Sequence, residues 1–302
     1  MFKQRQTVFC FFLIIVDCAK CCFADAWILY SLAPWINQLQ FVNLHSMSNN
    51  YQPETYWDKV AGHVAERKDI KIMAGDDEPY YRYKRKRFLE LLDTVDISGR
   101  SVLEIGSGPG GNLDYISNKG CRKITGVDIS SNMVALASEL LKDKGVEIVK
   151  INGRDLPFPD NTFDTVFTST VLQHNTNEEN LKALMAEICR VSGDEVLLFE
   201  RIEKRIKGHE SNLGRPISYY AAIMKQGGFE LAEKKPMPIQ ASYYVCGTIR
   251  KLFNPRSRKE GEPLTPFSIA LQKITLPVTK LLDEMIPSHR DVIMLRFKKV
   301  RK

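Results

Sequence analysis

Short apolar runs alternate with stretches of helical periodicity between residues 100 and 200. The apolar runs predict strands at 101–105, 123–127, 146–150, 163–168 and 194–200. The periodic stretches between them predict helices at 111–118, 131–143 and 178–192. Strands that alternate with helices in this way indicate an α/β fold, with a mostly parallel sheet covered by helices on both faces.

The alternation of helices and strands continues after residue 200, with a long gap between the last two strands. A helix at 217–227, closed by Gly227 and Gly228, and a strand at 229–235 are followed by a late strand at 292–299. The roughly 50 residues from Pro238 to Arg290 form an insertion between the last two strands. Within it, the stretch from Phe267 to Ile286 has apolar periodicity and is expected to break at Pro277. No internal repeat is present in the sequence.

The most informative stretch is residues 102–112, an apolar run that passes through Glu104 into a glycine-rich loop. Gly106, Gly108 and Gly110 let the backbone turn sharply and approach a ligand where a Cβ would collide. Together with Gly111, the first two also satisfy the G-x-G-x-x-G spacing of dinucleotide-binding loops, which is weak evidence without context. The loop therefore predicts a ligand site but does not identify the ligand.

Two later features supply the context. Asp128 ends the second strand about 20 residues beyond the loop, where a carboxylate accepts hydrogen bonds from ribose hydroxyls. The block 152–164, Asn-Gly-Arg-Asp-Leu-Pro-Phe-Pro-Asp-Asn-Thr-Phe-Asp, precedes the fourth strand, and Val171-Leu-Gln-His174 follows it. Nicotinamide-binding folds have no reason to carry this block. A nucleoside-containing ligand other than a nicotinamide dinucleotide is indicated.

In combination these motifs resemble the class I S-adenosylmethionine-dependent methyltransferases, most closely the type 11 methyltransferase domain group. The resemblance covers residues 100–200 and implies a Rossmann-like, doubly wound sheet of seven strands with an antiparallel last strand. It also implies S-adenosylmethionine as the cofactor. The cofactor-binding residues that it implies are Glu104, Gly106, Ser107, Gly108 and Gly110 at the methionine end, Asp128 and Ile129 at the ribose, Asn152 and Gly153 at the adenine, and Thr168 at the fourth strand.

Simpler interpretations of the same residues stay open. The glycine loop is also compatible with a plain tight turn, and Asp128 with a cap of the helix that starts near Ser130. Asp160 and Asp164 are typical turn formers rather than catalysts. His174 is expected either to be a satisfied structural residue or, if the methyl acceptor is a hydroxyl, to be the base that removes its proton. The family pattern has Asp where this chain has Asn152, and an amide still offers an acceptor oxygen.

Two segments outside the core are expected to shape the acceptor side. Residues 47–99 predict a helical lid in which Tyr80, Tyr81 or Tyr83 folds over the cofactor; an amphipathic helix that packs these rings on the core explains them equally well. Residues 238–290 are the helical, basic insertion, where this fold acquires acceptor specificity. The SAM-binding core then spans 100–237, and 291–302 hold the last strand and a basic tail.

The net charge of +7 narrows the chemical class expected for the methyl acceptor. A basic, amphipathic insertion favours an anionic or lipid-linked small molecule and is compatible with peripheral contact to a membrane. Nucleic acid is disfavoured because no module that reads it accompanies the charge. The cysteine spacings fit neither a disulfide framework nor a zinc site, so no metal is predicted. The sequence leaves the oligomeric state open.

Residues 1–46 form an apolar extension that resembles a signal peptide, with Lys3 and Arg5 before an apolar run and Ala24-Asp25-Ala26 as a cleavage pattern. Export would separate the enzyme from a cofactor kept inside cells, so we expect a cytoplasmic protein whose working chain begins at Met47. Mass spectrometry of the native N-terminus tests this expectation, and peptides from Gln4 to Gln40 would contradict it.

The sequence therefore predicts a methyltransferase that transfers a methyl group from S-adenosylmethionine to a small-molecule or lipid-like acceptor by in-line displacement. Two other classes stay open. A catalytically silent cofactor-binding or interaction protein is compatible with Asn152, and a nicotinamide-dependent oxidoreductase is disfavoured by the block from Leu156 to Asp164. Turnover separates the first alternative from an active enzyme, and cofactor binding separates the second.

Overall fold

The computed structural model describes residues 51–67, 73–288 and 291–300. The chain divides into two compact units, Met1–Ser48 and Asn49–Lys302, and all described residues belong to the second. The expectations for the extension at residues 1–46 lie outside the described residues. The division of the second unit into lid, core and insertion stays a prediction.

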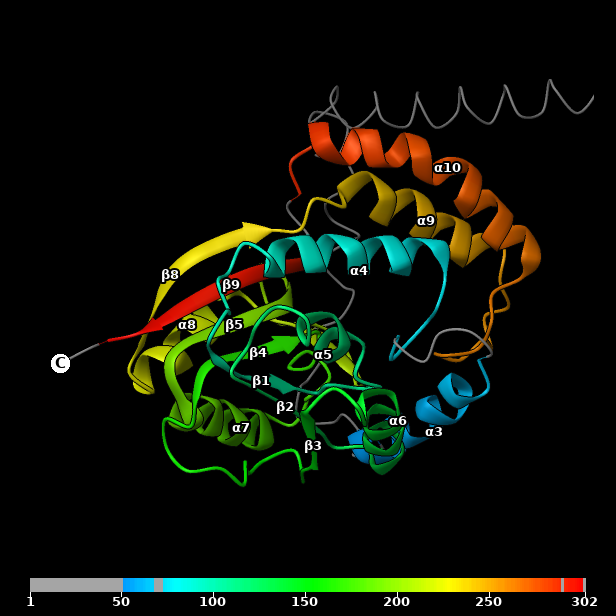
Figure 1. Cartoon of the computed structure of the whole chain (residues 1–302). Helices are drawn as coiled ribbons and strands as arrows, with labels where there is room; N and C mark the ends of the chain where they lie inside the picture. The colour runs from blue at the N-terminus through cyan, green and yellow to red at the C-terminus, as the bar shows by residue number, and fades with distance from the viewer. Residues whose placement is uncertain (1–50, 68–72, 289–290, 301–302) are drawn as a thin grey trace, which may run out of the picture. The chain divides into compact units, whose positions relative to one another are not determined.

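A seven-stranded sheet forms the centre of the second unit, in the order β3-β2-β1-β4-β5-β9-β8 (Figure 1). The strands from β1 to β5 run parallel, whereas β9 runs antiparallel to both of its neighbours. The predicted Rossmann-like fold with an antiparallel last strand is therefore confirmed. The strands are β1 (Ser101–Ile105), β2 (Lys123–Asp128), β3 (Val146–Lys150), β4 (Phe163–Ser169), β5 (Ser192–Ile202), β8 (Phe229–Pro236) and β9 (Asp291–Lys299).

Helices cover both faces of this sheet because the central strands are apolar on both sides. In β5, Leu197 and Phe199 pack in one core cluster, and Val196 and Leu198 in the other. The first cluster includes side chains of α4, α5 and α6, and the second includes side chains of α7 and α8. The helices of this layer are α4 (Pro79–Leu92), α5 (Gly111–Ile116), α6 (Ser131–Leu141), α7 (Glu178–Val191) and α8 (Ile217–Gln226).

The predicted core elements all form, and their ends differ by a few residues. The helix expected at 111–118 ends at Ile116, and the helix expected at 131–143 ends at Leu141. A small hairpin of β6 (Lys207–His209) and β7 (Asn212–Gly214) was not predicted. Its strands have three residues each, which is too short for a periodicity to appear in the sequence.

Of the helices in the described part of the chain, three lie outside the core, and two of them, α3 (Pro53–Ala65) and α9 (Gln240–Leu252), contribute residues to the site. Helix α3 is held on α6 by Asp58, whose Oδ1 accepts hydrogen bonds from Ser130 Oγ at 2.6 Å and Asn132 N at 3.2 Å. Helices α9 and α10 (Pro266–Met285) form the insertion between β8 and β9 and pack on α4. Figure 1 shows α10 as the outermost of these layers, with α9 and α4 between it and the sheet.

Pro277 does not break the helical stretch of the insertion, so that expectation was wrong. Helix α10 continues through it from Pro266 to Met285. A proline removes one backbone donor and crowds the preceding turn. The helix tolerates this cost because its inward face is fixed by hydrogen bonds on both sides of Pro277. Among them, Gln272 donates to Glu78 and Asp283 accepts from Ser242.

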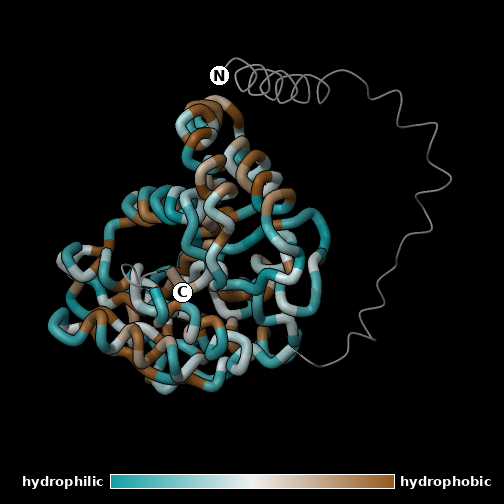
Figure 2. Tube along the Cα trace, turned by 90° about the vertical axis from the view of Figure 1, so that its right-hand side faces the viewer, coloured by the Kyte–Doolittle hydropathy of each residue, from teal (hydrophilic) through white to brown (hydrophobic). Residues whose placement is uncertain are grey.

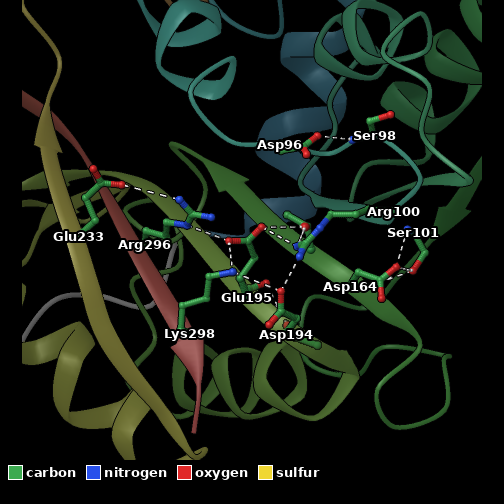
Figure 3. A network of polar contacts seen from close by, with 12 residues as sticks. Asp96, Ser98, Arg100, Ser101, Asp164, Asp194, Glu195, Glu233, Arg296 and Lys298 are labelled. Atoms are coloured by element: carbon green, nitrogen blue, oxygen red, sulfur yellow. Dashed lines mark hydrogen bonds and ion pairs between the residues drawn. The ribbon is translucent and has the colours of Figure 1, made fainter. Parts of the chain in front are cut away.

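A network of charges closes the end of the sheet at which the parallel strands begin (Figure 3). The fully buried Glu195 carboxylate is paired with Arg100 at 2.7 Å, Arg296 at 2.8 Å and Lys298 at 2.9 Å. These residues come from β5, from β9 and from the turn before β1, so the network ties the antiparallel strand to the parallel ones. Because the strands end at the opposite edge, this network has no part in the site.

In the part of the chain that the structure describes, no helix combines the length and the hydropathy needed to cross a bilayer.

Candidate functional site

Two adjoining cavities lie at the carboxyl ends of β1 and β4, where the strand order reverses. Such a reversal is the usual place for ligands in open α/β sheets. The smaller cavity has a volume of about 270 Å³ and the larger about 540 Å³. They share part of their walls, which makes them two chambers of one site. The shared lining consists of Trp57, Ala74, Gly106, Ser169, Thr170 and His174.

The glycine loop after β1 forms one wall of the smaller cavity. Gly106 has φ of +69°, and a Cβ there would lie 2.4 Å from Val171 Cγ2. Gly108 has φ of +52°, and its Cβ would lie 2.9 Å from Ala74 Cβ. Both positions therefore require glycine for conformation and for space. The close approach of the loop to the segment after β4 gives the cavity its shape.

Asp128, at the end of β2, holds the loop in place. Its carboxylate accepts hydrogen bonds from Gly108 N and from Ser130 N, both at 2.8 Å. Burial raises its pKa, and these backbone donors oppose that rise. Asp128 is not the cap of α6: Ser130 is, because its side chain accepts from Met133 N at 3.1 Å. Asp128 lines the smaller cavity, so its carboxylate faces both the loop and the space a ligand would take.

Glu104, two residues before Gly106, is fully buried. Its Oε1 accepts from Asn112 Nδ2 at 2.8 Å, and its Oε2 has no hydrogen-bond partner among the described residues. Burial raises the pKa of this carboxyl to about 8. The nearby Ser107 Oγ is also buried without a partner within the described part of the chain. Buried polar atoms normally have partners, so these two atoms fit a polar ligand that bonds to both.

At the other end of the smaller cavity, Asn152 and Gly153 follow β3 and face Ile129. Asn152 Oδ1 accepts from the backbone N–H groups of Arg154 at 2.8 Å and Asp155 at 2.9 Å. The amide oxygen therefore shapes this turn, and Gly153 has φ of +80° within it. Asn152 and Gly153 both line the cavity.

Three predicted cofactor residues do not reach the cavities. Glu104 is one of them, because it is fully buried and belongs to the lining of neither cavity. A Cβ on Gly110 would meet Leu141 and Ala137 of α6, so Gly110 serves the packing of the loop on that helix. Thr168 is buried in β4, and its Oγ1 donates to Glu200 Oε1 at 2.8 Å. Neither Gly110 nor Thr168 is part of the lining of either cavity.

Glu200 is a residue that the sequence reasoning missed. It is fully buried in β5 and accepts from the backbone N–H groups of Val171 at 3.0 Å, Leu172 at 3.1 Å and Gln173 at 3.2 Å. The carboxylate thereby fixes the segment that leads into His174. An acidic residue after the apolar run Val196 to Phe199 is the signal that could have indicated it.

Thr170 is a second missed residue. It lines both cavities and has φ of +58°. A β-branched residue rarely adopts such a conformation, and strained residues of this kind concentrate at functional sites. Its N–H donates to Phe199 O at 2.8 Å, which holds the strained turn against β5.

His174 stands in the wall between the two cavities. Its Nδ1 lies 2.8 Å from the carbonyl oxygen of Ser211, which only accepts, so Nδ1 carries the proton. Nε2 then holds the lone pair and accepts from Gln173 Nε2 at 3.2 Å. Burial lowers the pKa of His174, so the ring is neutral near pH 7. The Trp57 ring packs edge-on against it at 5.1 Å. The arrangement presents a fixed neutral imidazole at the junction.

The larger cavity is rich in charge. Its walls carry five cationic side chains and three carboxylates, and the carboxylates have partners within the protein. The cations are Lys84, Arg85, Arg201, Arg250 and Arg258, and the carboxylates are Asp76, Glu260 and Asp291.

Asp76 joins the segment before α4 to the insertion. It is buried and forms ion pairs with Arg250 and Arg258, and it also accepts from Gly261 N at 2.9 Å. Burial lowers the pKa of Arg250 to about 10. Asp76 is more than 170 positions from both arginines in the sequence, so no local pattern could have predicted the cluster.

Other charges of the larger cavity are less fully paired. Asp291 pairs with Lys84 at 2.5 Å, and Glu260 accepts from the Tyr56 hydroxyl at 2.6 Å. Arg85 forms no ion pair with any described residue; its Nη2 donates to Gly111 O at 2.7 Å, and its Nε is buried without a partner there. Arg85 is therefore a cation that the protein leaves partly unsatisfied at the cavity.

Of the three tyrosines proposed for a lid, the structure brings one to the site. Tyr81 lines the larger cavity, where its hydroxyl accepts from Arg250 Nη1 at 3.1 Å. Tyr80 and Tyr83 are buried in a core cluster. Their positions fit the alternative interpretation, in which the rings of α4 pack on the core.

Comparison with known proteins agrees with this geometry. A family described as "Methyltransferase domain" matches residues 103–198. A phosphatidylethanolamine N-methyltransferase from Cereibacter sphaeroides is 32% identical over 157 residues, which cover 47% of this chain and 76% of the relative. The chain belongs to the class I S-adenosylmethionine-dependent methyltransferases. It is thus an enzyme of this class, and the part shared with its relatives is the core around the glycine loop.

Other relatives share less of their length. A phosphoethanolamine N-methyltransferase from Triticum aestivum is 29% identical over 148 residues, which cover 48% of this methyltransferase chain and 27% of the relative. Among solved structures, the [4+2]-cyclase SpnF matches with a TM-score of 0.56 at 16% identity, covering 82% of this chain and 96% of that one. A putative sarcosine dimethylglycine methyltransferase from Galdieria sulphuraria matches with a TM-score of 0.52 at 17% identity, covering 80% and 97%. These structures support the fold, and a cyclase among them illustrates that fold alone does not set chemistry.

Proposed function

We propose that this methyltransferase binds S-adenosylmethionine in the smaller cavity and methylates the amine nitrogen of a small phosphate-bearing acceptor in the larger one. The observation that carries the proposal is the excess of cations around the larger cavity, five against three carboxylates. A phosphate monoester is the ligand that such a group of Arg and Lys side chains favours. Relatives named for phosphoethanolamine and for phosphatidylethanolamine fit the same chemistry.

The residues of the smaller cavity and of the glycine loop beside it fit the cofactor. The buried Glu104 Oε2, which has no partner among the described residues, can accept from the ammonium of the methionine part, and Ser107 Oγ, in the wall of the larger cavity, can bond its carboxylate. Asp128 offers its carboxylate to the ribose hydroxyls, and Ile129 and Gly153 offer an apolar surface to the adenine. Asn152 Oδ1 already accepts two backbone hydrogen bonds, so it contributes little to recognition of the adenine amino group. These roles rest on the family resemblance together with the unsatisfied atoms.

For the acceptor, Arg85 is the residue we assign first. Arg85 and Arg258 each have a buried Nε without a partner among the described residues, but Arg258 is paired with Asp76, whereas Arg85 forms no ion pair with a described residue. A phosphate oxygen supplies the partner that the Arg85 nitrogen lacks. The amine end then points toward the junction, where Trp57, Tyr56 and Glu260 offer aromatic faces and a carboxylate to a cationic nitrogen. Lipid-linked and free phosphoamines share this headgroup, so both belong to the proposed acceptor class.

The chain's own part in the reaction is mainly positioning. The cofactor supplies a sulfonium methyl group that is already activated and leaves a neutral thioether. The walls of the two cavities hold donor and acceptor in line and exclude water. An ammonium must lose a proton before nitrogen attacks, and the neutral His174 Nε2 at the junction is the base we assign to it.

Turnover with matched acceptors tests the proposal. The full chain is incubated with S-adenosylmethionine and either phosphoethanolamine, ethanolamine or vesicles containing phosphatidylethanolamine, and S-adenosylhomocysteine is measured. We expect product with a phosphate-bearing amine and at least tenfold less with ethanolamine. Equal rates with and without the phosphate would refute the acceptor assignment.

A variant that removes the charge of Arg85, compared with a control variant at the next residue, tests the acceptor assignment further. Arg85→Gln should raise the KM for the phosphate-bearing acceptor by about tenfold, since a charge-assisted hydrogen bond contributes about 1.5–3 kcal/mol. Lys86→Gln, on the exposed side of the same helix, should leave it unchanged. Titration with S-adenosylhomocysteine separates the two halves of the proposal, because Arg85→Gln should keep cofactor affinity even where acceptor binding fails.

A further inference from the structure

Helix α10 exposes apolar side chains on its outer face. Phe267, Ile274, Val278, Leu281 and Met285 are between 45% and 77% exposed. At 3.6 residues per turn, these five positions lie within about 40° of one line along the helix. They form a continuous stripe, which we call the outer stripe. Single exposed apolar residues are normal on a protein surface, but an aligned row of five marks a contact site.

The inner face of α10 is unusually polar, and this fixes the orientation of the outer stripe. Gln272 Nε2 donates to Glu78 Oε2 at 2.9 Å, and Asp283 Oδ1 accepts from Ala241 N at 2.7 Å. Turning the stripe inward would leave these buried groups unsatisfied, at a cost of about 1–3 kcal/mol each. The helix is therefore held with its apolar side outward. The buried polar side chains of this face are Ser268, Gln272, Thr279 and Asp283.

No described residue covers the outer stripe, because α10 lies on the outside of the fold. Helix α10 is the outer layer, packed on α9 and α4 (Figure 1). In Figure 2 the helices at the top of the second unit carry brown, hydrophobic segments on the part of the tube farthest from the sheet. Leu252, at the end of α9, adds a further exposed apolar side chain near Phe253 and Phe267, whose rings lie 5.1 Å apart.

Cationic side chains accompany the outer stripe. Between residues 240 and 286 the sequence has seven Lys or Arg and four Asp or Glu. Lys273 and Lys280 are exposed on α10, and Lys251, Arg256 and Lys259 are exposed at the end of the insertion where α9 leads into α10. None of these five forms an ion pair with a residue that the structure describes.

We infer that the outer stripe is a docking surface for a membrane that contains anionic lipids. Apolar side chains in a row, with exposed cations on the same helix and at its start that form no ion pair with described residues, are the features of a helix that lies in the plane of a bilayer surface. One of these cations, Lys280, lies 4.9 Å from the centre of the Tyr83 ring. Each Lys or Arg near such a surface contributes about 1 kcal/mol. A second copy of this chain fits less well, because a two-fold pairing of the stripe would bring the same cations together. The inference does not depend on the identity of the methyl acceptor.

The inference is tested by measuring vesicle binding together with the segment of the chain that the vesicles protect. The full chain is mixed with vesicles of phosphatidylcholine alone or with 30% phosphatidylglycerol, and binding is followed by flotation and by hydrogen–deuterium exchange. We expect binding to the anionic vesicles, at least tenfold weaker binding to the neutral ones, and slowed exchange in peptides from Pro266 to Met285.

Variants on the stripe provide the control. Ile274→Gln with Leu281→Gln should weaken vesicle binding through α10 by about tenfold or more, since apolar area drives the insertion. Ile206→Gln with Leu231→Gln, which changes exposed apolar residues elsewhere, should leave it unchanged. Both double variants should keep the melting temperature and the turnover of a water-soluble acceptor.

Two results would overturn the inference. One is vesicle binding that leaves the exchange of α10 unchanged, which would assign the contact to another segment. The other is a wild-type dimer that the Ile274→Gln, Leu281→Gln variant converts to monomer, with no binding to vesicles by either protein; sedimentation velocity detects this.

Discussion

Replacing Glu104 by Gln should stabilise the ligand-free protein and weaken cofactor binding. Glu104 is fully buried, and burial raises its pKa from the ordinary 4.5 to about 8. Near neutral pH the folded protein keeps this carboxyl protonated, whereas the unfolded chain ionises it. Gln has the same shape and no proton to exchange, and its oxygen still accepts from Asn112. The variant therefore removes the cost of burying the acid.

The size of the effect follows from the pKa. The contribution of a group whose pKa is raised in the fold is fully present below the unfolded pKa and is lost as pH rises toward the folded pKa. Between pH 4.5 and pH 7, at about 1.4 kcal/mol per pH unit, the free energy of unfolding of the wild type should fall by about 3 kcal/mol relative to that of the Gln variant. Other titrating groups are common to both proteins and cancel in the comparison.

Urea unfolding of both proteins at pH 5 and pH 7 measures the difference in the free energy of unfolding. We expect the advantage of Glu104→Gln to grow by about 2–3 kcal/mol between the two pH values. Titration with S-adenosylhomocysteine should show at least tenfold weaker binding by the variant, because the Glu104 carboxyl can give up its proton and pair with the ligand ammonium, whereas an amide cannot ionise. An advantage that stays constant with pH would refute the assigned pKa, and unchanged affinity would refute the role of Glu104 in binding.

Three further changes test other parts of the account. His174→Asn should lower kcat by about 10²-fold or more. Because burial lowers the pKa of His174, the wild type should lose activity only at acidic pH, where the ring becomes protonated, and this loss should be absent from the pH–rate profile of the variant. Gly106→Ala should lower the free energy of unfolding by about 1–3 kcal/mol and abolish cofactor binding, because its Cβ would lie 2.4 Å from Val171 Cγ2; calorimetry measures both. Glu195→Gln should cost about 3–5 kcal/mol of stability in urea unfolding, since it leaves Arg100 and two other cations without their buried partner, and should leave kcat unchanged.

The core of the fold was predictable because its signals are local. The apolar runs of β1 and β5 are buried on both faces, so each could be recognised without knowledge of its neighbours. The course of α10 could not be recognised in this way. Its buried face is polar and its exposed face apolar, so the usual inference from periodicity to burial points in the wrong direction. Hydrogen bonds to α4 and α9 decide its orientation, and these appear only in the folded chain.

The smaller cavity was largely predictable from the sequence, and the larger one was not. Glu104, Gly106, Asp128 and the turn at Asn152 occur at motif spacings, so the sequence suggested their convergence. The larger cavity joins α4, the segment before it and the insertion, as in the pair of Asp76 with Arg250. Its residues are brought together by the packing of α9 on α4, for which the sequence carries no spacing signal.

The most direct test of the central claim is a single-turnover reaction of the full chain with S-adenosylmethionine carrying a ¹³C-labelled methyl group and with phosphoethanolamine, followed by NMR. We expect the label to move to the amine nitrogen and give N-methyl phosphoethanolamine, and we expect Arg85→Gln to slow this transfer while cofactor binding is retained. Label found on an oxygen, or transferred equally to ethanolamine without the phosphate, would contradict it.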